Sequence, residues 1–109
     1  MSETMTMTEE EILEQIKRET GEHKVFLYMK GTPDMPRCGF SNQVVQILNH
    51  TGVEYGARDI LPDPRLRQVL SEWSDWPTIP QLFVDGKLVG GCDIVTEMFQ
   101  EGELEQVLR

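Results

Sequence analysis

Apolar and polar positions follow two different patterns of spacing along this chain, and each pattern predicts a different kind of secondary structure. The continuous apolar run Val25–Met29 is typical of a strand that is buried on both faces of a sheet. Apolar residues spaced three and four apart instead predict amphipathic helices. The first of these helices is expected after a Thr8–Glu11 capping box, and the second from Ser41 to about Asn49. The third follows the Asp63-Pro64 cap, and the fourth follows an Asp93 cap and has Ile94 and Val95 on its apolar side. A last short helix is expected over Leu104–Leu108.

The remaining segments read as strands and turns. Residues 55–60 form a weaker strand candidate, and two short apolar runs flank Asp85-Gly86, a dipeptide typical of β-hairpin turns. The segment 31–37 holds two prolines and predicts a loop. A helix between the first two strands favours parallel pairing, and the hairpin is antiparallel. The pattern predicts an α/β fold of the thioredoxin-like plan: a four-stranded mixed sheet, parallel pair plus antiparallel hairpin, with helices on both faces.

Length and charge narrow the function. The chain has 109 residues, enough for one core, and we expect a flexible tail over residues 1–8 and one domain over residues 9–109. The net charge of −9 makes nucleic acid and anionic membrane surfaces poor partners, because binding to phosphate groups needs a basic patch. No apolar run is long enough to span a bilayer, and the first residues do not read as a secretory signal.

The cysteines carry the most specific chemistry. Two cysteines without an export signal indicate free thiols in a reducing compartment, and we expect a cytoplasmic protein. Cys38 lies between the apolar strand and a predicted helix, at a helix N-terminus, where a thiol is biased towards thiolate. The spacing is that of a C-x-x-C motif, but Ser41 stands where the second cysteine would be. A serine cannot close a disulfide, so a second sulfur has to come from elsewhere.

Four motifs in this order identify a family resemblance. The sequence resembles monothiol glutaredoxins of the CGFS type in four stretches, which are Lys30 with the loop 31–36, Cys38-Gly39-Phe40-Ser41, Trp76 to Gln81, and Gly90 to Asp93. The resemblance implies binding of glutathione and of a [2Fe-2S] cluster between two monomers. Each monomer would contribute Cys38, and each of two glutathiones would contribute its thiol. Four thiolates are a suitable ligand set for such a cluster.

The same resemblance assigns roles to charged residues. Lys30, which ends the buried strand, would bind the glycine carboxylate of glutathione and lower the pKa of the Cys38 thiol. Arg67 matches a carboxylate-binding arginine of the family. On sequence alone both cations also read as solvated, and neighbouring Arg65 is an equally good candidate; the resemblance selects Arg67.

Backbone and small residues complete the expected site. The family pattern implies a cis peptide between Ile79 and Pro80, whereas X-Pro statistics alone favour trans. The Ile79 backbone would then pair with the cysteinyl residue of glutathione. Asp93 is expected to accept from the γ-glutamyl ammonium, or to act only as a helix cap, or both. Cys92 is a resolving thiol, a packing residue or a backbone contact, and the backbone contact is favoured.

Two main functions compete. The first is a carrier that transfers a [2Fe-2S] cluster to apo iron-sulfur client proteins and is a homodimer when it holds the cluster. The second is a glutathione-dependent oxidoreductase, with weak activity at most, in which Cys38 takes glutathione from a protein and passes it to a second glutathione. A redox-sensing interaction module is a third, weaker possibility. The proline-rich loop 31–36 favours the carrier.

Overall fold

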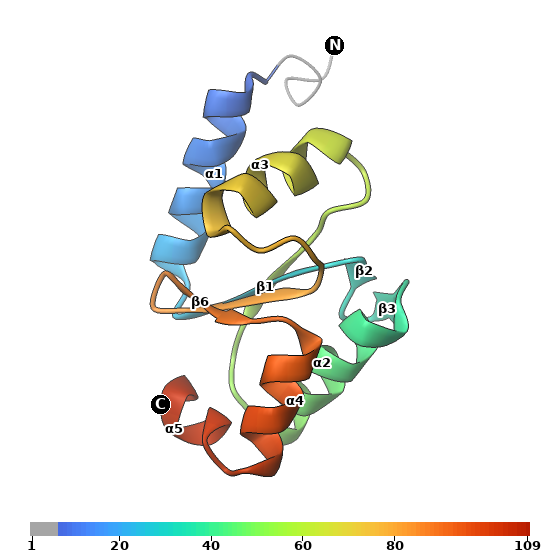
Figure 1. Cartoon of the computed structure of the whole chain (residues 1–109), viewed down its shortest axis with the longest axis vertical. Coiled ribbons are helices and arrows are strands. Elements are labelled where there is room, and N and C mark those ends of the chain that lie inside the picture. Colours follow the sequence, from blue (N-terminus) through green and yellow to red (C-terminus); the bar gives the residue numbers. More distant parts are fainter. Residues whose placement is uncertain (1–6) are drawn as a thin grey trace.

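The protein is built around a four-stranded sheet that has helices on both faces (Figure 1). A computed structural model describes residues 7–109, so most of the expected N-terminal tail lies outside the described residues. The elements are α1 (Glu9–Glu22), β1 (Val25–Met29), β2 (Gly31–Thr32), β3 (Met35–Pro36), α2 (Gly39–Thr51), β4 (Gly56–Asp59), α3 (Pro64–Ser74), β5 (Gln81–Val84), β6 (Lys87–Gly90), α4 (Cys92–Gln100) and α5 (Leu104–Leu108).

The sheet topology confirms the prediction. The strand order is β4-β1-β5-β6, with β1 parallel to β4, antiparallel to β5, and β5 antiparallel to β6. The most apolar strand, β1, is an inner strand, and all five of its side chains are buried. The thioredoxin-like fold follows from this arrangement.

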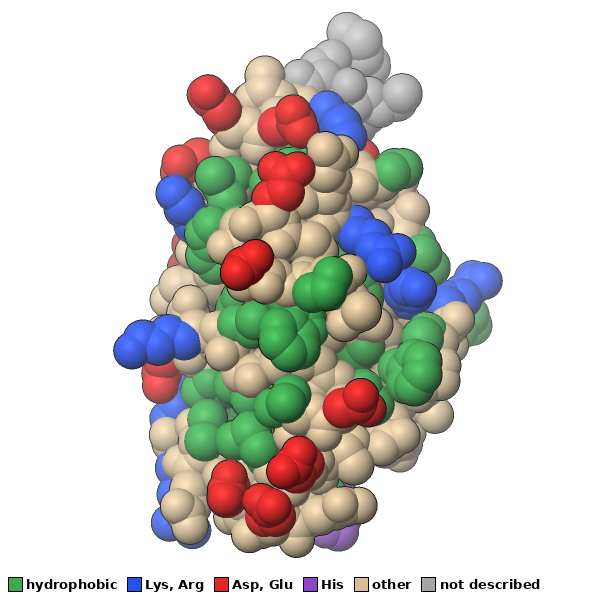
Figure 2. Space-filling view, viewed as in Figure 1, with side chains coloured by type: hydrophobic (Ala, Val, Ile, Leu, Met, Phe, Trp, Pro, Cys, Tyr) green, Lys and Arg blue, Asp and Glu red, His purple; other side chains and the backbone are tan. Residues whose placement is uncertain are grey.

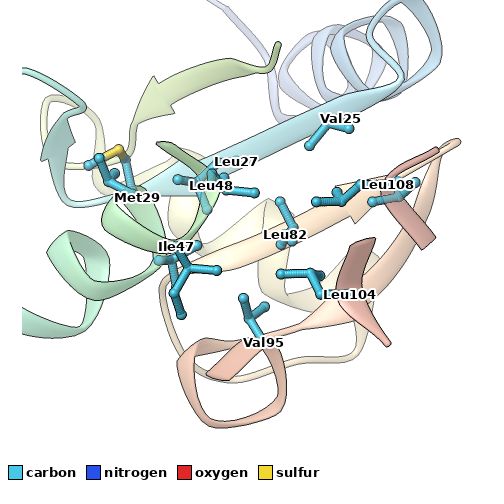
Figure 3. Close-up of a cluster of buried hydrophobic side chains, with 12 residues drawn as sticks. Val25, Leu27, Met29, Ile47, Leu48, Leu82, Val95, Leu104 and Leu108 are labelled. Carbon is cyan, nitrogen blue, oxygen red and sulfur yellow. The ribbon is translucent and has the colours of Figure 1, made fainter. Parts of the chain in front are cut away.

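Alternation along β1 separates two cores. Val25, Leu27 and Met29 point to the face covered by α2, α4 and α5, where Figure 3 shows them facing side chains such as Leu48 and Leu104. The residues between them, Phe26 and Tyr28, point to the face covered by α1 and α3. Successive side chains of a strand lie on opposite faces, so a strand between two helical layers has to be apolar throughout.

Helix ends fix how the helices enter the layers. The Thr8 hydroxyl accepts from the Glu11 N–H while the Glu11 carboxylate accepts from the Thr8 N–H, so the predicted capping box is confirmed. Asp63 caps α3 by accepting from the Arg65 N–H at 3.0 Å. Within the part of the chain that the structure describes, no helix has the length and apolar character needed to cross a bilayer.

Three local predictions were wrong. The α2 helix begins at Gly39, two residues before the predicted start, because Cys38 already occupies the cap position. Asp93 does not cap α4: Gly91 is the cap residue, and Asp93 lies in the first turn. Ile94 was expected on the buried side of this helix, but it is 37% exposed. The helix starts two residues earlier than the Asp93 cap implied, and Ile94 lines a surface cleft rather than the core.

The loop after β1 is more regular than predicted. Residues 31–36 form a two-stranded hairpin of β2 and β3, which the prolines in the sequence obscured. Gly31 has φ 88°, and a Cβ atom there would lie 2.7 Å from the Arg37 nitrogen, so only glycine fits this position. The Gly31 N–H donates to Asp59 Oδ1 at 2.9 Å, which ties the hairpin to the end of β4.

Candidate functional site

A cleft of about 420 Å³ opens beside the end of β1 and the starts of α2 and α4. All six residues that the sequence singled out line it: Lys30, Cys38, Arg67, Ile79, Cys92 and Asp93. Phe40 and Ile94 also line the cleft and were missed: Ile94 lies in an apolar helical stripe, which reads as core, and Phe40 precedes the predicted helix and received no role of its own. A larger hollow of about 860 Å³ lies at the opposite end of β1, around residues 22–25 and 53–55, but no cysteine lines it.

Cys38 is placed for thiolate chemistry. It is the N-cap of α2, with φ −149°. Hydrogen bonding from the Ser41 backbone N–H is the main reason that the pKa of the Cys38 thiol is lowered, with smaller contributions from the Phe40 N–H and the positive charge of Lys30. Partial burial opposes this effect. The helix start therefore favours the nucleophilic form.

Two cationic side chains line the same cleft as this thiol. Lys30 comes from the end of β1 and Arg67 from α3, and neither forms an ion pair within residues 7–109. Arg65, in contrast, forms an ion pair with Asp63 at 3.1 Å and donates to the Met7 carbonyl. The fold thus separates two arginines that the sequence alone could not rank, and it places Arg67 in the cleft.

The segment before β5 forms one wall. The Ile79–Pro80 peptide is cis, as the family resemblance implied. Behind it, the fully buried Gln81 side chain donates to the carbonyls of Trp76 at 2.9 Å and Thr78 at 3.2 Å. These two bonds hold the segment against the sheet, so the Ile79 backbone has a fixed position at the cleft.

Gly91 brings the start of α4 against the same wall. A Cβ atom there would lie 3.1 Å from Trp76 Nε1 and 3.2 Å from the Pro80 carbonyl oxygen. The glycine therefore permits close packing of the helix start on residues 76–80, and it leaves the first N–H groups of α4 without a side-chain cap. Uncapped N–H groups at a helix start are suited to an anion.

Cys92 lies in the cleft but differs chemically from Cys38. Both thiols are free. Burial is the main reason that the pKa of Cys92 is raised, and its Sγ lies 3.9 Å from Thr96 Oγ1, which accepts from Gln43 Nε2. Cys92 is thus a partly buried thiol whose raised pKa disfavours the thiolate, and its role as a backbone contact stays a prediction.

The described residues hold no metal site of their own. No group of three or more His, Cys, Asp or Glu side chains among residues 7–109 is arranged to hold a metal ion.

The fold and the site together define a thioredoxin-fold protein with one activated thiol in a cationic cleft. The family model described as Glutaredoxin matches residues 25–89, which cover β1 through most of β6. The chain therefore belongs to the glutaredoxin family, and Ser41 in place of a second cysteine makes it a monothiol member.

Individual relatives agree with this assignment. The chain is 60% identical over 83 residues to the probable monothiol glutaredoxin GrlA of Legionella pneumophila, covering 76% of this chain and 93% of that protein. It is 52% identical over 97 residues to glutaredoxin 4 of Escherichia coli, covering 89% and 84%. Among solved structures, reduced poplar apo GrxS14 matches with a TM-score of 0.77 and 47% identity over 85% of each chain.

Proposed function

We propose that this monothiol glutaredoxin binds glutathione in the cleft and, as a homodimer, carries a [2Fe-2S] cluster to apo iron-sulfur client proteins. The observation that carries the proposal is the single activated thiol of Cys38 in a cleft where Ser41 replaces the second cysteine. A lone thiolate favours chemistry that takes its other sulfurs from outside the chain. The free thiols of Cys38 and Cys92 are consistent with a reducing location such as the cytoplasm.

The cleft suits glutathione group by group. Glutathione carries two carboxylates and one ammonium, and the cleft offers two cations, Lys30 and Arg67, and one exposed carboxylate, Asp93. The N–H groups at the start of α4 are a second anion-binding feature. The Ile79 backbone beside the cis peptide is in reach of the cysteinyl part of a ligand in the cleft. Each group of the ligand thus has a complementary partner.

The cluster is the cargo in this proposal. Four thiolates ligate such a cluster, and each chain supplies one, so two chains and two glutathiones complete the set. Cys92 is a poor substitute ligand, because its raised pKa disfavours the thiolate that iron needs.

Anaerobic reconstitution with iron, sulfide and glutathione tests the proposal. The wild-type protein should turn brown and elute as a dimer, and omission of glutathione should prevent both changes. Cys38→Ser should form neither cluster nor dimer, whereas Cys92→Ser is the matched control and should form both. A normal cluster in Cys38→Ser, or a cluster-bound monomer, would overturn the proposal.

The alternative function is deglutathionylation. The lowered pKa of Cys38 favours it, because a thiolate attacks a mixed disulfide faster than a thiol does. We propose that this activity is at most weak, since the chain lacks a partner thiol with thiolate character to resolve the product.

A further inference from the structure

We propose that the β2–β3 hairpin is a docking surface for proteins whose reactive cysteine is flanked by acidic residues, with Arg37 as the residue that selects them. The inference rests on the proposed use of Cys38 and glutathione in the cleft. It concerns the protein partner of the reaction, namely which glutathionylated proteins transfer their glutathione to Cys38.

Arg37 lies outside the glutathione cleft but beside its nucleophile. The hairpin pairs Gly31 with Pro36, and at its open end the Arg37 N–H donates to the Lys30 carbonyl at 2.9 Å. Arg37 is exposed, does not line the cleft, and forms no ion pair within the described range 7–109. Its charge therefore remains available after glutathione has taken up Lys30 and Arg67.

Local packing and a backbone hydrogen bond fix the position of Arg37. A Cβ atom at Gly31 would lie 2.8 Å from Arg37 Cγ, so the glycine makes room for the arginine stem to lie across the hairpin. Lys30 and Arg37 are opposite each other on paired backbone segments, and like charges in opposite positions destabilise a strand pair. A chain with a net charge of −9 thus has two cations on paired backbone positions, one of them directly before Cys38 in the sequence, an arrangement that an anionic partner would stabilise.

Apolar side chains next to this cation indicate a polypeptide rather than a small anion. Met35 on β3 and Phe40 in the first turn of α2 are each 63% exposed, the highest exposure of any large apolar residue in the described part of the chain. Figure 2 shows Lys and Arg side chains gathered at the right of the molecule, where Figure 1 places β2 and β3, with hydrophobic side chains beside them. In the absence of the anionic cluster, a second copy of this chain fits less well, because a two-fold contact through this face sets cations against cations.

The chemical step is a thiol–disulfide exchange. The Cys38 thiolate attacks the glutathione sulfur of a glutathionylated partner, and a bond forms between the Cys38 and glutathione sulfurs as the partner's disulfide bond breaks. The partner cysteine leaves as a thiolate and takes a proton from water, with no net oxidation or reduction. Acidic residues beside that cysteine would face Arg37 as the partner docks.

Single-turnover transfer to Cys38 tests the inference. Two glutathionylated nonapeptides that differ only in flanking residues, Glu or Lys, are mixed with the full chain, and the Cys38–glutathione adduct is followed by mass spectrometry. The Glu peptide should react about tenfold faster at low salt, and the ratio should shrink as ionic strength rises. Arg37→Glu should bring the ratio to one or below. Arg18→Glu makes the same charge change at an exposed position of α1 and should leave the ratio of the two rates unchanged.

The ratio is taken within each variant, so a general loss of reactivity does not affect it. Equal rates for the two peptides in the wild type, an unchanged ratio in Arg37→Glu, or an equal loss in Arg18→Glu would overturn the inference. If the wild-type protein forms a dimer in the absence of peptide and Arg37→Glu makes it monomeric, the inference is also overturned, because the surface then binds a second copy of the chain. Failure of the proposed use of Cys38 and glutathione in the cleft is a separate result: no transfer to Cys38 even from the small mixed disulfide of glutathione and mercaptoethanol.

Discussion

The buried Ser41 hydroxyl accepts a hydrogen bond from the Lys30 backbone N–H at 3.1 Å. This bond joins the end of β1 to the first turn of α2 and so fixes Lys30 next to the cap residue Cys38. The position that holds the second cysteine of a C-x-x-C motif thus has a structural role in this protein. No sulfur at that position is available to release a product from Cys38.

Turnover on a small glutathione mixed disulfide should therefore be weak. Without an intramolecular resolving thiol, each cycle depends on a second glutathione from solution. A steady-state assay coupled to glutathione reductase measures this activity, with a dithiol glutaredoxin assayed in parallel. Rates similar to those of the dithiol protein would favour the enzyme over the carrier.

Lys30→Ala should weaken glutathione binding and shorten the lifetime of the cluster. The variant removes a cation from the cleft and one of the groups that lower the pKa of Cys38. Because the cleft is open to solvent, we expect a loss of about 1 kcal/mol, roughly fivefold in Kd. Calorimetry of glutathione binding and decay of the visible absorption band measure the two effects.

Arg65→Ala is the matched control for this variant. Arg65 carries the same charge near the cleft, but it is engaged by Asp63 and the Met7 carbonyl. Its removal should leave glutathione affinity nearly unchanged. Equal losses in the two variants would mean that diffuse charge, rather than the cleft geometry, controls binding.

The two cysteines should differ in the pH at which they are alkylated. Because the pKa of Cys38 is lowered, its thiolate persists to lower pH than that of an ordinary cysteine, and its alkylation rate falls only as the pH drops through that lowered value. The pKa of Cys92 is raised, so its reaction should begin at higher pH. Iodoacetamide labelling with peptide mass spectrometry resolves the two sites, and the reverse order would contradict the site description.

Gly91→Ala should destabilise the protein and weaken glutathione binding together. The new methyl group would meet Trp76 Nε1 at 3.1 Å and the Pro80 carbonyl oxygen at 3.2 Å, and the backbone oxygen has little freedom to retreat. Strain of this kind typically costs about 1–3 kcal/mol. Chemical denaturation and calorimetry measure the two losses.

Gly21→Ala is the control for the glycine substitution. Apart from the neighbouring residues and the backbone of α1 itself, no atom lies within 4 Å of a Cβ added at Gly21, which sits in the last turn of α1. Alanine there should increase stability by about 0.5–1 kcal/mol, because it favours the helix and restricts the unfolded chain. Unchanged stability in Gly91→Ala would show that the start of α4 is not tightly packed on residues 76–80.

Much of the fold could be predicted because local patterns express it directly. The apolar run Val25–Met29 requires cover on both faces, and the stripe that includes Val44, Val45 and Leu48 requires one buried side. The Asp85-Gly86 turn sets the antiparallel hairpin of β5 and β6. The hairpin at residues 31–36 escaped prediction, since prolines argue against strands and its pairing depends on the positive φ of Gly31.

The sequence by itself determined the reactive group: a lone thiol at a helix start, with serine where a second thiol would be. Only the tertiary structure decided which distant residues meet that thiol. Lys30, Arg67, Ile79 and Asp93 come from four separate segments, and their convergence depends on strand order and on close packing at Gly91. It also paired Arg65 with Asp63 and placed Arg67 and Ile94 at the cleft, because the side of a helix that borders the cleft depends on how the helix packs on the sheet, and spacing alone leaves that open.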